Sequence, residues 1–394
     1  MSRLKITAFL EYLLISWIIF EYFTIYMRFL SYETIYTIGF AILIPLLVIS
    51  HKKSNVKIIT APFIFYLLII LILTLYNKRL LLYSVLYLGY LPLCYIYFRT
   101  SKVYNNHTFG IEWLKKYCNI ITIIALISLI FWIGTNIFNI FTPTSYIPSN
   151  WGENASFIPS YYYLYFETQT TFFAGYELQR NTAIFTEAPV CNLLYCFALT
   201  IEIFLTNKKS LIRKIILITA IITTFSTTGQ MFLILILFIY IIFYIPSKSK
   251  IRKLLLFSLP FLLYIAYTTA TFIIQDKSAS SSYEDRQEHI SEMINLGMKN
   301  PIGGIGVMTY DKGISNSIFH LFAEGGILLF IIYFYFLLVI PFNYFKRQKD
   351  IRWILTNGLF FFLFIFTVAY YKSLDLTLIA YSLANIDKKH LSIN

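Results

Sequence analysis

The amino-acid sequence predicts an all-α, polytopic integral membrane protein with about 12 transmembrane helices and two long extracytoplasmic loops. Hydrophobic residues make up 58% of the chain, charged residues make up only 13%, and the mean hydropathy is +0.69. Apolar runs of about 18 residues or more recur, which is the length that a bilayer core requires. No internal repeat or Gly/Ser linker divides the chain. Residues 1–394 are therefore expected to form a single membrane domain.

The expected spans follow the apolar runs in order, with boundaries good to a few residues. Arg3 and Lys5 lead straight into the first run without a small-residue cleavage site, so this run is expected to be an uncleaved anchor. The last span is short and is expected to be tilted or interfacial. The spans are 6–27, 32–50, 57–76, 79–98, 117–141, 184–206, 211–228, 230–246, 254–274, 317–342, 353–371 and 373–387.

The basic residues are distributed unevenly between the connections. Counted along the alternating spans, 23 of the 32 Lys and Arg residues fall on one side of the membrane. Because basic residues accumulate in cytoplasmic connections, both termini are expected in the cytoplasm. The net charge of +13 then reflects topology and does not indicate a nucleic-acid partner. No disulfide or metal pattern occurs, and the four cysteines are expected to be buried thiols: Cys94, Cys118, Cys191 and Cys196.

The first long connection, residues 142–183, is rich in aromatic residues and ends near Arg180. Long ordered loops on a scaffold are usually functional. Its rings are suited to stacking on sugars, but an aromatic belt at the membrane interface is the favoured interpretation. The cluster consists of Tyr161, Tyr162, Tyr163, Tyr165, Phe166, Phe172, Phe173 and Tyr176.

The second long connection, residues 275–316, is also expected outside the cytoplasm. A capping box at 282–285 predicts the start of a helix. Arg286 then shares one helix face with Met293 and Gly297. An arginine on a buried face is costly unless an anion meets it. Arg286 is therefore a candidate anion-binding residue.

A glycine-rich stretch at 301–306 is expected to end this helix. It is not a dinucleotide-binding fingerprint, because no strand precedes it. Gly303, Gly304 and Gly306 are expected to form a tight turn whose backbone amides approach a ligand or a neighbouring helix. An apolar helix is expected to begin near Asn316.

Asn316, His320 and Glu324 recur at i, i+4 and i+8, which gives one polar stripe at the outer end of that helix. Ionisable groups within a span are costly and usually face a cavity. The stripe is a candidate site, and a structural hydrogen-bond ladder between helices is the alternative. Three other acidic residues in apolar runs are interpreted as snorkelling or structural: Glu11, Glu21 and Glu202.

Arg180 and Arg286 are the strongest catalytic candidates. Guanidinium groups bind phosphate bidentately and keep their charge. The alternative is that each arginine pairs with a nearby carboxylate, such as Glu177 or Glu284. Glu187, just inside the sixth span, is a candidate base or the orienting partner of Arg180.

The order of these motifs resembles the O-antigen polymerase and O-antigen ligase superfamily. Members carry an arginine that opens a loop helix, then a Pro-x-x-G-x-G segment, a short polar motif and a helix with Glu-x-Gly. Arg180 and residues 185–189 resemble the family's other arginine and its Phe-x-Glu-Pro-like element. The turn at 226–229 resembles its Ser-Arg-Gly turn without the arginine, although a plain turn is favoured there. The resemblance covers about residues 180–345, and the matches in the second connection are Arg286, 301–306, 315–317 and 324–326.

One difference concerns the short polar motif. Ligase-like members usually have a histidine just before the asparagine, where this chain has Ser315. His320 lies about one and a half turns further along the helix and cannot be assumed to replace it. The difference favours a polymerase over a ligase.

The resemblance implies a membrane-embedded, GT-C-like glycosyltransferase in the bacterial inner (cytoplasmic) membrane. A polymerase would move a growing glycan from undecaprenyl diphosphate to an incoming lipid-linked repeat unit, for O-antigen, other lipopolysaccharide, capsule or exopolysaccharide. A ligase would transfer it to another acceptor. The partners would be the lipid-linked oligosaccharide, membrane lipid and a chain-length regulator. No cofactor or metal is expected, and the sequence has no Asp-x-Asp.

The resemblance also implies roles for the candidate residues. Arg286 and Arg180 would stabilise the departing diphosphate in place of a metal ion, and Glu187 or His320 would take the acceptor proton. A flippase is a further alternative, but transporters favour inverted repeats and midplane charges, which this sequence lacks. The residues expected to bind substrate are Gly303, Gly304, Gly306, Ser315, Asn316 and Glu324.

Overall fold

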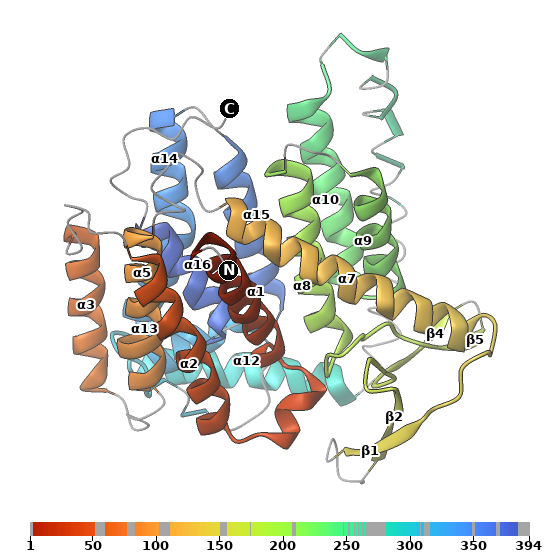
Figure 1. Ribbon diagram of the computed structural model, residues 1–394, viewed down its shortest axis with the longest axis horizontal. Coiled ribbons are helices and arrows are strands. Elements are labelled where there is room, and N and C mark those ends of the chain that lie inside the picture. The colour runs from red at the N-terminus through yellow and green to blue at the C-terminus, as the bar shows by residue number, and fades with distance from the viewer. Residues whose placement is uncertain are drawn as a thin grey trace. The chain divides into compact units, whose positions relative to one another are not determined.

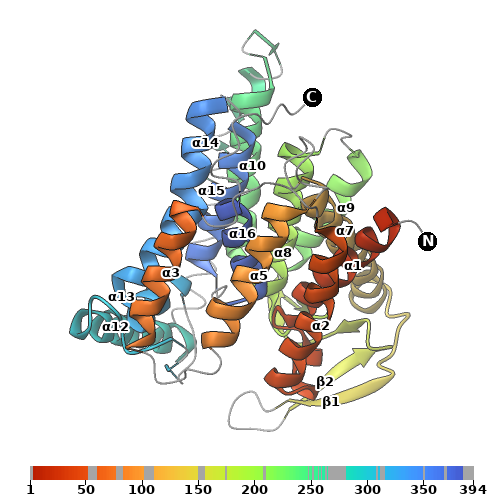
Figure 2. The same ribbon diagram turned by 60° about the vertical axis from the view of Figure 1, so that its left-hand side comes forward.

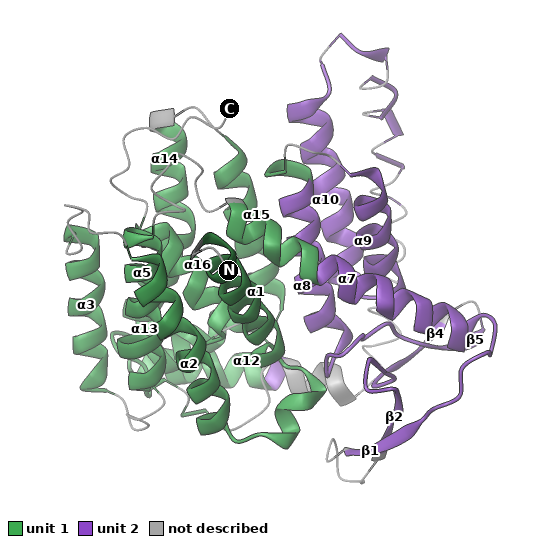
Figure 3. Cartoon of the chain, viewed as in Figure 1, with its two compact units in different colours: residues 1–120, 203–208, 289–394 green, residues 121–202, 209–288 purple. Residues whose placement is uncertain are grey.

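A computed structural model describes residues 3–51, 60–76, 83–101, 111–149, 156–173, 175–206, 210–246, 248–250, 253–255, 257–258, 260–261, 264, 281–307, 309–310, 316–348, 351–367 and 371–384. About 75% of the structure is helical. Two compact units are distinguished in Figure 3. Unit 1 comprises residues 1–120, 203–208 and 289–394, and unit 2 comprises residues 121–202 and 209–288.

The helices fit a membrane protein. Four are long and apolar enough to cross a membrane, judged by length and composition among the described residues. The predicted spans other than 254–274 each overlap helical residues, although several ends differ, as for 117–141 against Ile111–Asn136; most of 254–274 lies outside the described residues. The four long helices are Tyr32–Ser50, Glu112–Asn136, Thr227–Tyr244 and Ser317–Lys346.

Unit 1 is a helix bundle in which α1 packs against α2, and α5 packs against α2 and α16 (Figures 1 and 2). A 3₁₀ turn at Ile25–Phe29 follows α1, and π-helical stretches at Ser84–Tyr90 and Tyr335–Val339 lead into α5 and α14. The helices are α1 (Arg3–Glu21), α2 (Tyr32–Ser50), α3 (Ala61–Thr74), α5 (Leu91–Thr100), α12 (Ser281–Lys299, in unit 1 from residue 289), α13 (Ser317–Phe334), α14 (Ile340–Gln348), α15 (Ile351–Phe366) and α16 (Ser373–Ala384).

Helix α16 is buried inside unit 1. All 12 of its residues are buried. At 1.5 Å per residue it is about 18 Å long, shorter than a hydrocarbon core of about 30 Å. Both of its ends therefore need partners from the protein. At the C-terminal end, Arg99 Nη1 donates to the carbonyl oxygen of Ala384 at 3.0 Å.

Unit 2 contains helices and the only strands of the described residues. A three-stranded antiparallel sheet has the order β1-β2-β3, and β4 and β5 form a separate hairpin. Ile147 pairs with Ile158, and Tyr161 pairs with Tyr165. The elements are α7 (Ile111–Asn136, in unit 2 from residue 121), β1 (Ser145–Ser149), β2 (Ser156–Tyr161), β3 (Tyr165–Phe166), β4 (Thr170–Phe173), β5 (Tyr176–Gln179), α8 (Ala188–Phe204), α9 (Leu211–Thr223) and α10 (Thr227–Tyr244).

The strands modify the predicted all-α class within the first long connection. Tyr161 and Tyr165 are buried with Trp132 of α7, and Phe131 and Phe141 pack against them. Three rings of the predicted aromatic cluster, Tyr161, Tyr165 and Phe166, are therefore part of a core that fixes the loop. Four others are exposed: Tyr162, Tyr163, Phe172 and Tyr176. The four cysteines are buried and form no disulfide, as predicted.

Candidate functional site

In unit 1 the glycine-rich turn at 301–306 completes a break in α13. Gly326 has φ 57° and ψ −157°, which interrupts the helix. The amides of Ile327 and Leu328 therefore donate to the carbonyls of Pro301 and Ile302, at 2.8 and 3.3 Å. In an uninterrupted helix these two amides would donate to the carbonyl oxygens of Ala323 and Glu324. Here those two oxygens accept hydrogen bonds from the turn instead. Ile305 donates to Ala323 and Gly306 donates to Glu324, each at 2.9 Å.

These contacts require glycine on both segments. A Cβ at Gly304, where φ is +65°, would lie 2.3 Å from the carbonyl carbon of Glu324. A Cβ at Gly326 would lie 2.4 Å from the carbonyl oxygen of Ile302. Of the two predicted partners of the turn, a ligand or a helix, the structure therefore shows a helix. Gly303 packs against the ring of Tyr76.

The polar stripe of α13 is buried. His320 and Glu324 are fully buried, and His320 Nε2 lies 3.3 Å from Glu324 Oε1. The same carboxylate oxygen accepts a hydrogen bond from the backbone amide of Tyr310 at 2.7 Å. The Tyr310 ring stands edge-on to His320, and its hydroxyl donates to Glu292 Oε2 at 3.0 Å. This group of residues joins α12, α13 and the turn between them.

Asn316 has a structural role at the start of α13. Its side-chain oxygen accepts from the amides of Ile318 and Phe319, which is the geometry of a helix N-cap. Its Nδ2 donates to the carbonyl oxygen of Ile365 in α15 at 2.7 Å. These bonds match the hydrogen-bond ladder that the sequence offered as an alternative.

The structure does not describe the side chains of two candidate residues in the second long connection. Residue 286 belongs to α12, but the side chain of Arg286 lies outside the described residues, as does Ser315. The predicted buried face is present further along α12, because Met293 and Gly297 are both buried. Gly297 packs against the ring of Phe322 in α13.

In unit 2, Arg180 follows β5 and reaches the end of α9. Its Nε donates to the carbonyl oxygen of Thr224 at 2.9 Å, and Nη2 donates to that of Phe225 at 3.3 Å. Cations are favourable near the C-terminus of a helix, where carbonyl groups lack helical partners. The contacts shown are with the 224–225 turn, whereas the sequence alternative was a pair with Glu177.

Glu187 and the turn before α10 lie in the same unit as Arg180. Glu187 immediately precedes α8 and is half-buried. Gly229, in the first turn of α10, is buried against Asn192 of α8, and a Cβ there would lie 2.1 Å from Asn192 Oδ1. The Gly229 backbone is therefore covered by a side chain of α8. Close packing of α8 on α10 explains this glycine.

Sequence reasoning did not identify an acid in the first connection, Glu167. It is half-buried between β3 and β4. Burial raises the pKa of the Glu167 carboxyl, and hydrogen bonds from Tyr161 and Thr135 oppose that effect. No sequence signal distinguishes this glutamate from an exposed loop residue.

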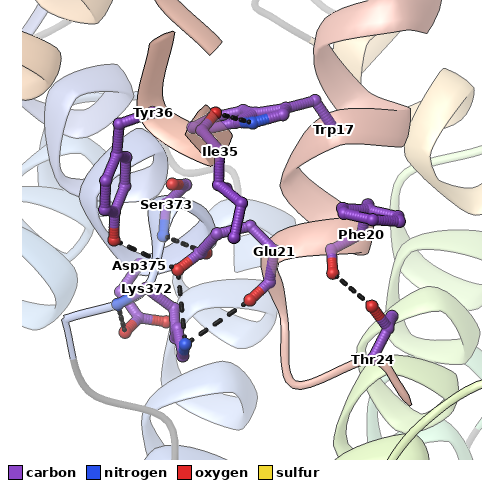
Figure 4. A network of polar contacts seen from close by, with 9 residues as sticks. All are labelled: Trp17, Phe20, Glu21, Thr24, Ile35, Tyr36, Lys372, Ser373 and Asp375. Atoms are coloured by element: carbon purple, nitrogen blue, oxygen red, sulfur yellow. Dashed lines mark hydrogen bonds and ion pairs between the residues drawn. The ribbon is translucent and has the colours of Figure 1, made fainter. Parts of the chain in front are cut away.

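The structure also joins Glu21, interpreted from the sequence as structural, to the segment that precedes α16 (Figure 4). Glu21 Oε1 accepts from Lys372 Nζ and from the Tyr36 hydroxyl, each at 3.3 Å. Glu21 Oε2 accepts from the amide of Ser373 at 3.1 Å. Asp375 lies in the first turn of α16. The available signal was the presence of Lys372 and Asp375 at the start of an apolar segment.

Among the described residues, no group of three or more His, Cys, Asp and Glu side chains is arranged to hold a metal ion. Comparisons of the chain with protein-family models, curated proteins and solved structures found no match. A functional assignment therefore depends on the chain's own residues.

Proposed function

We propose that the protein is a polysaccharide repeat-unit polymerase of the cytoplasmic membrane. It would transfer a growing glycan from undecaprenyl diphosphate to an incoming lipid-linked repeat unit at the outer face. The observation that carries this proposal is the position of the Arg180 guanidinium, which donates to the carbonyl oxygens of Thr224 and Phe225 beside the first turn of a long apolar helix. A guanidinium in this position can bind a diphosphate head group bidentately.

Arg180 has support from α10 in this role. The first amides of a helix lack intrahelical acceptors and favour anions, and α10 begins two residues after Phe225. Asn192 lies against this first turn, and its buried Nδ2 has no hydrogen-bond partner among the described residues. These donors would stabilise charge that grows on the departing diphosphate.

The reaction needs a base as well as a stabilised leaving group. The acceptor hydroxyl oxygen would bond to the anomeric carbon while the bond from that carbon to the diphosphate oxygen breaks. The diphosphate would leave with the electron pair, and a base would take the hydroxyl proton. Glu187 is the better candidate of the two, since it is half-buried and lies seven residues after Arg180. His320 is fully buried beside Glu324, which favours a structural role.

A deletion strain complemented with variants tests the proposal. Wild-type protein is expected to restore long glycan chains, measured by gel and by mass spectrometry of lipid-linked glycans. Arg180→Ala is expected to lower chain extension by a factor of about 100 or more at unchanged protein level, with single repeats held on the outer leaflet. Lys299→Ala, which removes an exposed cation at the end of α12, is the control and should leave the chain-length distribution unchanged.

Two other outcomes would contradict the proposal. Full-length polymer retained on the lipid carrier of the deletion strain would indicate a ligase, which differs only in its acceptor. Single repeats trapped on the cytoplasmic face would indicate a flippase. Normal chain length with Arg180→Ala would exclude Arg180 as a catalytic residue.

A further inference from the structure

The residues that join α1 to α16 form a buried ionic cluster with more acids than bases. Glu21 and Asp375 are fully buried, and the side chain of Lys372 is 11% exposed. Figure 4 shows both carboxyl groups close to Lys372. The ammonium of Lys372 also lies 3.9 Å from the centroid of the Phe23 ring. Two carboxylates and one ammonium would leave one negative charge uncompensated in the protein interior, which is costly.

The two carboxyl groups differ in the donors they receive. Glu21 accepts bonds from the Lys372 ammonium, the Ser373 amide and the Tyr36 hydroxyl. Three donors stabilise an ionised carboxylate. Asp375 receives two backbone amides, that of Lys372 at 3.4 Å on Oδ2 and its own, and no hydrogen bond from a charged donor among the described residues. Glu21 is therefore the group suited to carry the negative charge.

The remaining oxygen of Asp375 lies among other polar atoms that lack partners. Asp375 Oδ1, the hydroxyl oxygen of Ser373 and the hydroxyl of Tyr22 are all buried, and none has a hydrogen-bond partner among the described residues. Tyr22 lies within electrostatic range of Asp375. The two hydroxyl groups can each donate or accept, and a carboxylic acid at Asp375 would add one more donor to these three oxygens without adding a second buried negative charge.

The backbone on both sides of the cluster is strained. Phe23, two residues after Glu21, has φ 54°, and Tyr371, directly before Lys372, has φ 57°. Aromatic residues rarely adopt this left-handed conformation, which persists only where surrounding contacts hold it. The ends of α1 and α16 therefore meet in a conformation that depends on the cluster between them.

We propose that Asp375 is a proton-binding site, occupied in the folded protein, that neutralises the joint between α1 and α16. Loss of this proton would leave two buried carboxylates facing one ammonium and would loosen the joint. The titratable groups around Asp375 are Glu21 and Tyr22 at the end of α1, Lys372 before α16 and Tyr333 of α13.

The stability of the purified full-length protein in detergent tests this proposal. The folded protein would hold a proton that an exposed aspartate releases above about pH 4. The ratio of folded to unfolded protein should therefore fall as pH rises, by up to about tenfold per pH unit from this group. Asp375→Asn keeps an oxygen acceptor for the Lys372 amide and imitates the protonated acid. It should fold and lose this part of the pH dependence, whereas Glu112→Gln, the control, should retain the wild-type profile.

A second measurement needs only the wild-type protein. Infrared spectra at neutral pH should contain the C=O stretch of a protonated carboxylic acid that is protected from exchange. Absence of this band would overturn the proposal, as would an Asp375→Asn profile with the wild-type pH slope. Stabilisation of the wild type by sodium at constant pH and ionic strength, lost in Asp375→Asn, would identify a sodium site and would also overturn it.

Discussion

One tight turn in each long connection places a different kind of residue at its left-handed positions. In the second connection, the left-handed positions among the described residues are glycines, with φ 65° at Gly304 and 107° at Gly306. In the first connection, the turn between β2 and β3 places Tyr162 and Tyr163 at φ 52° and 57°. This turn closes through a hydrogen bond from the Leu164 amide to the Tyr161 carbonyl oxygen at 2.9 Å.

The difference shows what each turn accomplishes. The glycine turn brings backbone against backbone and repairs the break in α13, so a side chain there would collide. The tyrosine turn retains two exposed rings although each left-handed position costs about 1–2 kcal/mol for a residue with a Cβ. Asn-Gly is the preferred pair for positive φ at both central residues. The tyrosine turn of the first connection is therefore suboptimal for stability. The glycine turn of the second connection is constrained by its close backbone contacts with α13.

The largest effect is expected from a side chain on the broken helix. Gly326→Ala would place a Cβ 2.4 Å from the Ile302 carbonyl oxygen, at a positive φ. We expect a loss of about 3 kcal/mol or more in the free energy of unfolding, or failure to accumulate. Gly358→Ala is the matched control, because that helical glycine has nothing within 4 Å of its Cβ position. Equal thermal stability of both variants would contradict the role assigned to the turn.

A smaller loss is expected where the turn is fixed by a side chain. Glu324→Ala would remove the acceptor of the Tyr310 amide and the partner of His320. Leaving such buried groups unsatisfied costs about 1–3 kcal/mol. Glu324→Gln keeps an oxygen acceptor and should recover most of the stability. Thermal unfolding in detergent distinguishes the two, and a Gln variant as unstable as the Ala variant would show that charge, and not the hydrogen bond, matters.

A gain in stability is expected from the tyrosine turn. Replacing Tyr162-Tyr163 by Asn-Gly should raise the free energy of unfolding by about 1–2 kcal/mol, since the strain at both positions is relieved. The double Phe variant retains the strain and should unfold at the wild-type temperature. If Asn-Gly lowers the unfolding temperature, the two rings contribute more to packing than their exposure indicates.

The smallest effect concerns pH. Because burial raises the pKa of Glu167, the folded protein binds a proton at this residue more readily than the unfolded chain does. The stability from this proton is present at low pH and is lost as pH rises through the folded pKa. Glu167→Gln should flatten the pH profile of the unfolding temperature slightly in the acidic range. An unchanged profile would show that the hydrogen bonds from Tyr161 and Thr135 cancel the effect of burial.

Hydrophobic periodicity and capping residues were sufficient to predict most helices. Asn316 was identified as the start of α13, and it is the N-cap. The strands of the first connection were not predicted, because short runs such as β2 are interrupted by Pro159 and carry no clear alternation. The unit 1 glycines were identified as a turn, but not their partner, since the break at Gly326 lies 20 residues further along the chain.

The sequence identified candidate residues but not the residues that they contact. Arg180 was identified, but its carbonyl acceptors at 224 and 225 are 44 and 45 residues away in sequence. Glu21 and Lys372 are 351 residues apart, so no local pattern could connect them.

The sequence by itself determined a helical membrane protein, the order of its apolar segments and the positions of its glycine and arginine motifs, because these follow from local hydrophobicity and conformational preference. Only the tertiary structure decided that α16 is buried at both ends, that Gly326 faces Ile302 and that Glu21 meets Lys372 and Asp375. Burial and pairing depend on which distant segments share the interior, and there each polar group must find a partner that water would otherwise provide.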